Sequence, residues 1–120
     1  MNSDGQSLAG IVSFGPFALI KEKRLLTKDG APVSIGGRAL DVLIALASRA
    51  GEVVAARDLI DIVWPGVTVE EVNLRVQITA LRKALGDGKD GFRYIVSVSG
   101  RGYVFIAPIK RDAANRPAPI

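Results

Sequence analysis

The chain has 120 residues, of which 48% are hydrophobic and 23% are charged, and it contains neither histidine nor cysteine. Its length is typical of one domain. Without those two residue types, disulfides, thiol catalysis and the commonest general base and metal ligand are excluded. The sequence therefore predicts no enzyme, no cofactor and no metal site. No apolar run approaches the roughly 20 residues of a membrane span, and residues 1–10 lack a signal-peptide pattern, so we expect a cytoplasmic location.

The positive charge is concentrated in the second half of the chain. Residues 1–71 carry seven Lys or Arg and nine Asp or Glu. Residues 72–110 carry seven Lys or Arg but only two Asp or Glu, and the net charge of the whole chain is +4. This distribution is typical of a protein that binds a polyanion with one of its surfaces.

The first third of the chain is rich in β-prone runs. We expect residues 1–10 to be disordered and an antiparallel sheet of three or four strands to follow. Asp29 and Gly30 supply the positive φ that a tight hairpin turn needs, so the runs on either side of them should pair. The expected strands are residues 11–14, 17–20, 24–27 and 32–35.

Two helices should come next. Residues 38–50 are apolar over much of the helical circumference, which indicates a largely buried helix. After a brief extended piece at 53–54, residues 57–63 form a short amphipathic helix that Pro65 prevents from continuing. Trp64 either caps the core or packs with its ring while its N–H donates outward.

The strongest helical signal lies at residues 71–85. Acidic residues begin this segment and basic residues end it, which complements the helix dipole. Gly86 suits the position that follows a helix. Branched apolar residues recur at helical spacing and form one stripe. The stripe consists of Leu74, Ile78, Leu81 and Leu85.

The opposite face of this helix carries hydrogen-bonding and cationic side chains, with no carboxylate after Glu71. Arg, Asn, Gln and Thr match the base edges of a DNA major groove, but an ordinary solvated face is the alternative. For Arg75 a competing role is an ion pair with Glu71, one helical turn away. The candidate DNA-binding residues on this helix are Asn73, Arg75, Val76, Gln77, Thr79, Ala80, Arg82 and Lys83.

A β-hairpin should close the domain. Residues 94–98 and 103–106 are β-prone, and the glycine-flanked turn between them presents Arg101. Residues 109–120 show no periodicity and read as a tail or linker. The order of sheet, three helices and hairpin predicts an α+β winged helix-turn-helix fold.

Spaced motifs across residues 11–108 carry a family resemblance. The most specific are Leu-Arg-Lys-Ala-Leu at 81–85 and Gly-Arg-Gly-Tyr-Val-Phe at 100–105. Together they resemble the OmpR/PhoB-type winged-helix DNA-binding domain of bacterial transcriptional regulators. The resemblance implies a four-stranded N-terminal sheet and three helices, with the third helix in the major groove of double-stranded DNA. It also implies a C-terminal wing, residues 97–103, at the minor groove.

The resemblance further implies contacts and partners. The loop 64–70 corresponds to one that can touch RNA polymerase, and such domains can form weak or DNA-dependent dimers. Ser99 stands where some relatives place a minor-groove arginine, which Arg101 can replace from the turn. If Met1 is the native start, the chain resembles regulators that carry this domain first and a sensor or effector segment later, and a complete single-domain protein is the alternative. The family's groove-facing positions fall on Asn73, Val76, Gln77, Thr79, Ala80 and Arg82, and its phosphate contacts fall on Trp64 and Ser97.

Two other functions compete with sequence-specific DNA binding. A winged helix can instead present its surface to a protein, and Trp64 with Val67 and Val69 can form an apolar contact. The basic, carboxylate-poor second half of the chain favours nucleic acid, and the scarcity of aromatic residues disfavours RNA. Catalysis is disfavoured because the chain lacks a nucleophile–base pair and a phosphate-binding glycine loop.

Overall fold

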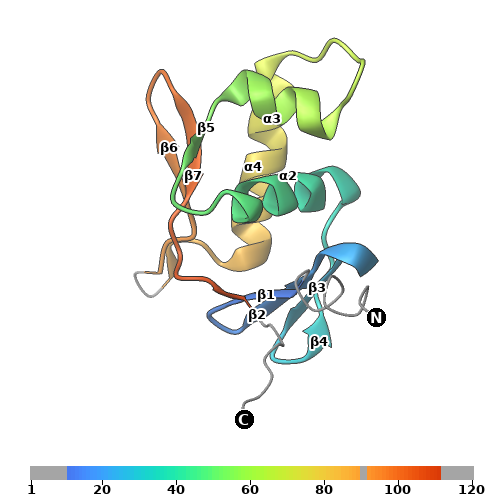
Figure 1. The fold of residues 1–120 in the computed structure, drawn as a ribbon, viewed down its shortest axis with the longest axis vertical. Helices are drawn as coiled ribbons and strands as arrows, with labels where there is room; N and C mark the ends of the chain where they lie inside the picture. The colour runs from blue at the N-terminus through green and yellow to red at the C-terminus, as the bar shows by residue number, and fades with distance from the viewer. Residues whose placement is uncertain (1–10, 90–91, 112–120) are drawn as a thin grey trace, which may run out of the picture. The chain divides into compact units, whose positions relative to one another are not determined.

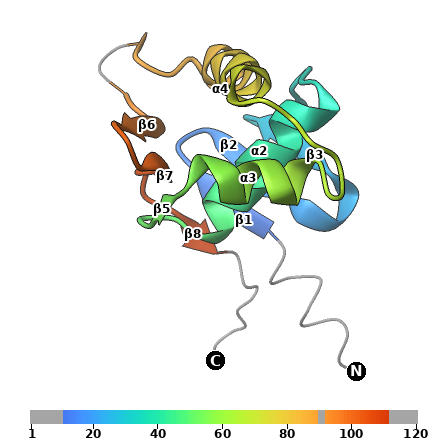
Figure 2. The same cartoon turned by 90° about the horizontal axis from the view of Figure 1, so that it is seen from above.

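The computed structural model describes residues 11–89 and 92–111. The described residues belong to two compact units, one formed by residues 11–33 with 108–111 and the other by Ser34–Ala107. Figures 1 and 2 together label the α-helices and β-strands of both. Residues 1–10 and 112–120, for which disorder and a tail were expected, lie outside the described residues.

The first unit is an antiparallel sheet (Figure 1). Its N-terminal part is the predicted four-stranded sheet, made of β1 (Ile11–Phe14), β2 (Phe17–Ile20), β3 (Leu25–Lys28) and β4 (Ala31–Pro32). A short 3₁₀ helix, Lys21–Lys23, joins β2 to β3. Strand alternation places one set of apolar side chains on a single buried face. That set consists of Val12, Phe14, Phe17, Leu19 and Leu26.

The sheet differs from the sequence prediction at both of its edges. The fourth strand covers residues 31–32 instead of 32–35. The last hydrogen bond between this segment and β3 is the one that the Val33 N–H donates to the Leu26 carbonyl at 2.8 Å. A fifth strand, β8 (Lys110–Arg111), pairs with β1, although these two residues were expected to belong to a tail. A two-residue strand has no periodicity that could reveal it in the sequence.

The second unit contains the helices α2 (Gly37–Ser48), α3 (Ala56–Val63) and α4 (Glu71–Leu85). A three-stranded sheet completes it, with strand order β5-β7-β6. Its strands are β5 (Val53–Val54), β6 (Ile95–Val98) and β7 (Gly102–Phe105). Figures 1 and 2 both show these strands to one side of the three helices. The predicted winged helix-turn-helix, with β6 and β7 as the wing, is confirmed.

The core of this unit forms where the three helices meet. Helix α2 packs against both α3 and α4, and α3 packs against α4. The buried side of α2 spans much of its circumference, as its apolar pattern predicted. The predicted stripe of α4 is also buried, since Leu74, Ile78, Leu81 and Leu85 are all nearly inaccessible to solvent. Burying this stripe leaves the polar face of α4 at the surface.

One glycine allows the wing to lie against β5. Gly102 begins β7 with φ +150°, and Val54 of β5 pairs with the next residue, Tyr103. A Cβ atom built on Gly102 would overlap the Val54 carbonyl oxygen and lie 2.9 Å from the Ala55 Cα. Only glycine therefore permits this close approach of two backbones.

Candidate nucleic-acid interface

Helix α4 presents the surface that the sequence predicted. Among its predicted site residues, Gln77 and Arg82 are half-buried and the others are exposed. The only acidic residue of the helix is Glu71, in its first turn, and Arg82 and Lys83 lie in its last turn. A helix of this length is about 22 Å long, and a major groove about 12 Å wide can accept a helix. The exposed side chains are Asn73, Arg75, Val76, Thr79, Ala80 and Lys83.

The C-terminus of α4 turns sharply back toward the wing. Gly86 adopts the left-handed conformation with φ 69°. The Asp87 N–H donates to the Arg82 carbonyl at 2.9 Å, and the Gly86 N–H donates to the Lys83 carbonyl at 3.2 Å. These two bonds make a Schellman ending, with Gly86 at the position after the helix that the sequence predicted.

Asp87 ties this helix end to the base of the wing. Its side chain is only 3% exposed. Its Oδ2 accepts hydrogen bonds from the Tyr94 and Ile95 backbone N–H groups, both at 2.9 Å, and its Oδ1 accepts one from Arg93 Nε at 3.0 Å. Burial raises the pKa of the Tyr94 phenol above its usual value, and repulsion from the Asp87 carboxylate adds to this increase.

Arg82 makes a second connection between α4 and the wing. Its Nε and Nη2 donate to the Ile95 carbonyl oxygen at 3.3 and 3.2 Å, and Nη2 also donates to Ser97 Oγ at 3.0 Å. The sequence suggested a direct DNA contact for both Arg82 and Ser97. The structure brings these two predicted site residues together.

The wing turn stands free of the helices. Ser99, Gly100 and Arg101 are all exposed, and the turn is closed by the Arg101 N–H, which donates to the Val98 carbonyl at 2.9 Å. Gly100 supplies the left-handed residue of the turn, with φ 74°. Arg101 therefore lies at the tip of the hairpin, as predicted, and is available to a ligand.

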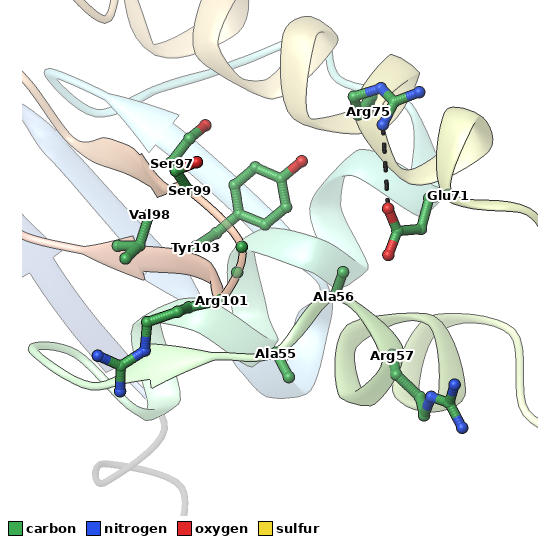
Figure 3. Close-up of a pocket in the computed structure, with 12 residues that line it drawn as sticks. Ala55, Ala56, Arg57, Glu71, Arg75, Ser97, Val98, Ser99, Arg101 and Tyr103 are labelled. Carbon is green, nitrogen blue, oxygen red and sulfur yellow. Dashed lines mark ion pairs between the residues drawn. The ribbon is translucent and has the colours of Figure 1, made fainter.

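A hollow of about 500 Å³ lies between the wing and the starts of α3 and α4. Figure 3 shows an arginine on each of the surrounding elements: Arg57 on α3, Arg75 on α4 and Arg101 on the wing. Tyr103 projects from β7 between the wing and α4. Three arginines and a single carboxylate, that of Glu71, line the hollow, so its charge is positive overall and favours an anionic ligand.

A family model described as "Transcriptional regulatory protein, C terminal" matches residues 30–105. The chain belongs to this family. Its predicted OmpR/PhoB-type membership, and with it the prediction of a DNA-binding domain of transcriptional regulators, is confirmed. The match includes all three helices and both wing strands.

Relatives of known role support the same membership. The chain is 36% identical over 106 residues to the transcriptional regulator HilA of Salmonella typhimurium, which covers 88% of this chain and 19% of HilA. It is 30% identical over 100 residues to the transcriptional activator CadC of Escherichia coli, covering 82% of this chain and 20% of CadC. The chain thus spans about a fifth of the length of these two regulators.

Solved structures of the family have the same fold. The DNA-binding domain of E. coli CadC matches with a TM-score of 0.75 at 28% identity, covering 85% of this chain and 96% of that one. The Klebsiella pneumoniae RstA DNA-binding domain, solved in complex with the RstA box, matches with a TM-score of 0.68 at 28% identity. That match covers 80% of this chain and 96% of the RstA domain.

In this OmpR/PhoB-type domain, the ion pair of Arg75 with Glu71 does not exclude the DNA contact that is the other role expected for Arg75. Its Nη1 lies 3.9 Å from Glu71 Oε1, and the two side chains are 62% and 64% exposed. An ion pair that exposed is worth at most about 1 kcal/mol, because water screens it. So weak a pair leaves the Arg75 guanidinium able to exchange Glu71 for another anion.

Trp64 ends α3 and begins the loop that the family resemblance associates with RNA polymerase. The Trp64 N–H donates to the Ile60 carbonyl at 2.8 Å, and its side chain is half-buried. Arg38 of α2 fixes this end of the helix, because its Nη1 donates to the Val63 carbonyl at 3.0 Å. The loop beyond Trp64 leaves Val67 60% exposed.

Sequence reasoning missed Asp87, Arg57 and Tyr103 as parts of the interface or its support. Asp87 resembles any acidic loop residue until its backbone partners are known, and Arg57 resembles a solvated helix residue. Tyr103 carried the one available signal, since it lies within the Gly-Arg-Gly-Tyr-Val-Phe motif. Within residues 11–89 and 92–111, no helix is long and apolar enough to span a membrane, and no three metal-ligating side chains cluster.

Proposed function

We propose that this domain binds a specific sequence of double-stranded DNA to regulate transcription, with α4 in the major groove and the wing at the adjacent minor groove. The observation that carries the proposal is the opposition of two faces on α4. One face is the buried apolar stripe, and the other is exposed and has no carboxylate after Glu71. The names of the relatives, as transcriptional regulators and DNA-binding domains, support the same function.

The side chains divide into those that read bases and those that hold phosphates. Asn73, Gln77 and Thr79 offer hydrogen bonds to base edges, and Val76 and Ala80 offer apolar contact to a thymine methyl group. Cations and polar groups around this face would contact phosphates, and the wing tip would enter the minor groove. The phosphate and wing contacts would come from Trp64, Arg75, Lys83, Ser97, Ser99 and Arg101.

The test starts with selection of an operator from random duplexes, followed by affinity measurements at two salt concentrations. Lys83→Ala should weaken binding to all sequences and lower the salt dependence by about one counterion. Asn73→Ala should instead cost about 1–3 kcal/mol on the selected operator and little on unrelated DNA. Asp61→Ala, on the exposed side of α3, is the control and should bind like the wild type. Equal losses in all three variants would contradict the assigned face.

We also propose that the loop 64–70 contacts a protein of the transcription machinery such as RNA polymerase. The family resemblance motivates this proposal, and the exposed apolar side chains of Val67 in the loop and Ile62 on α3 would lose contact with water if a protein covered them. Val67→Ser should lower transcription from a target promoter without changing operator affinity. A parallel loss of operator affinity would argue against a separate role for the loop.

Three further expectations belong to this proposal. Residues 11–111, which include β8, would act together as the DNA-binding domain, with residues 112–120 as the tail or linker. Two copies would associate weakly on tandem half-sites. Analytical ultracentrifugation with one-site and two-site duplexes tests the last point, and a stable dimer without DNA would contradict it.

A further inference from the structure

The guanidinium group of Arg82 is already occupied in the free protein. Its Nε–H and both hydrogens of Nη2 are directed to acceptors on β6, the Ile95 carbonyl and Ser97 Oγ. A guanidinium has five N–H donors, so three of them are committed. The two that remain are both on Nη1.

This geometry conflicts with reading a base. Specific recognition of guanine by arginine uses two parallel N–H groups from different nitrogens of the planar fork. Every such pair in Arg82 includes a hydrogen on Nε or Nη2, and those are bound to β6. Arg82 can make a bidentate base contact only by breaking hydrogen bonds inside its own domain. A single Nη1–H would still be free for a phosphate.

The acceptors of Arg82 lie on the open edge of the wing. Among the described residues β6 pairs only with β7. The Tyr94 carbonyl accepts the Ile106 N–H at 2.9 Å, on the β7 side. Successive carbonyls alternate in direction along a strand, so the Ile95 carbonyl faces away from β7, where Arg82 meets it. Arg82 thus satisfies an edge carbonyl that otherwise has no strand partner.

Two side chains, Arg82 in the last turn of α4 and Asp87 just beyond its end, therefore hold the wing at successive points. The Asp87 carboxylate holds the strand at its base, through the Tyr94 and Ile95 N–H groups. Arg82 holds it one step further toward the tip, through Ile95 and Ser97. Only three residues separate Ser97 from Arg101 along the chain. A fixed Ser97 consequently restricts where Arg101 can lie relative to α4.

We propose that Arg82 is a positioning residue, which sets the wing relative to α4 and acts on DNA affinity through Arg101, and that it does not read a base. The inference rests on the proposed DNA-binding function and changes the role that sequence reasoning gave to Arg82. It implies that α4 and the wing have a fixed relative position in the free protein. The spacing between the major-groove and minor-groove contacts is then preorganised for binding.

A double-mutant cycle on operator affinity tests this role. Arg82→Ala and Arg101→Ala should each weaken binding about tenfold, and the double variant should also be only about tenfold weaker, because Arg82 acts through Arg101. Independent losses that multiply to about 100-fold would overturn the proposal. Lys83→Ala is the matched control: it removes a neighbouring cation with no hydrogen bond to β6, and its loss should multiply with that of Arg101→Ala.

Two more measurements separate geometry from charge. Arg82→Lys keeps the positive charge but loses the planar fork, so its affinity should fall as far as that of Arg82→Ala, and full rescue by lysine would overturn the proposal. In NMR spectra without DNA, Arg82→Ala should shift the amides of residues 98–102, and unchanged wing amides would also overturn it. If Arg82→Ala does not fold, Ser97→Ala, which removes one of the three hydrogen bonds, should shift the amides of residues 100–102 in spectra without DNA, and unchanged amides there would overturn the proposal. Failure of the wild type to bind any duplex would instead refute the proposed function.

Discussion

Gly102→Ala should destabilise the domain far more than the same substitution at Gly100, two residues away. Both glycines have positive φ, +150° at Gly102 and +74° at Gly100. They differ in what a methyl group would meet. At Gly100 nothing lies within 4 Å of the new Cβ, whereas at Gly102 it would overlap the backbone carbonyl of Val54. A backbone atom in the middle of the β5–β7 pairing cannot rotate away as a side chain can.

The magnitudes follow from these two environments. Gly100→Ala should cost about 1 kcal/mol, for the positive φ alone. Gly102→Ala carries a similar conformational cost and, in addition, about 1–3 kcal/mol for forcing β5 and β7 apart. The total of about 2–4 kcal/mol is a large share of the 5–15 kcal/mol by which a domain is normally stable. The two variants should differ by about 1–3 kcal/mol.

Urea unfolding followed by circular dichroism measures this difference directly. In thermal unfolding, each 1 kcal/mol corresponds to about 4–8 °C for a domain of this size. Gly100→Ala should also retain operator binding, because the turn that presents Arg101 keeps its shape, whereas Gly102→Ala should lose both stability and the wing's contribution to affinity. Equal destabilisation by the two substitutions would refute the argument that the Val54 carbonyl selects glycine.

Three other predictions follow from the interface and its support. Asp87→Asn should lower the unfolding free energy by about 1–3 kcal/mol, because the buried charged acceptor of two backbone N–H groups is lost. A change within about 0.5 kcal/mol, the scatter of surface substitutions, would contradict a stabilising role for the Asp87 hydrogen bonds. Because the pKa of Tyr94 is raised on folding, the folded state holds its proton more tightly. Stability should therefore decline as pH rises above the usual tyrosine pKa of about 10, and Tyr94→Phe should make that decline shallower in urea titrations at pH 8 and 10.5. Glu71→Gln should raise affinity for unrelated DNA several-fold at low salt by freeing Arg75 and removing a repulsive charge, an effect that should vanish at high salt.

The sequence by itself determined the elements whose signals are local. Helix α4 could be predicted because its apolar period, terminal charges and C-terminal glycine all lie within 17 consecutive residues, 70–86. The same holds for the Asp29-Gly30 turn and for the exposed Arg101 turn. In each of these segments the physical cause, a backbone conformation or a repeating contact, involves residues close together in the chain.

The tertiary structure alone decided which partners those residues take. The pairing of β8 with β1 joins residues about 100 positions apart, and no short segment encodes it. The residue type of Arg82 and its place on the polar face of α4 suggested a DNA contact. Its hydrogen bonds instead go to β6, 13 and 15 residues further along the chain. Asp87 likewise meets Tyr94 and Ile95 only because Gly86 turns the chain toward the wing. A donor or acceptor is specified by its residue type, but its partner depends on where the whole chain places the two groups, and that is settled only on folding.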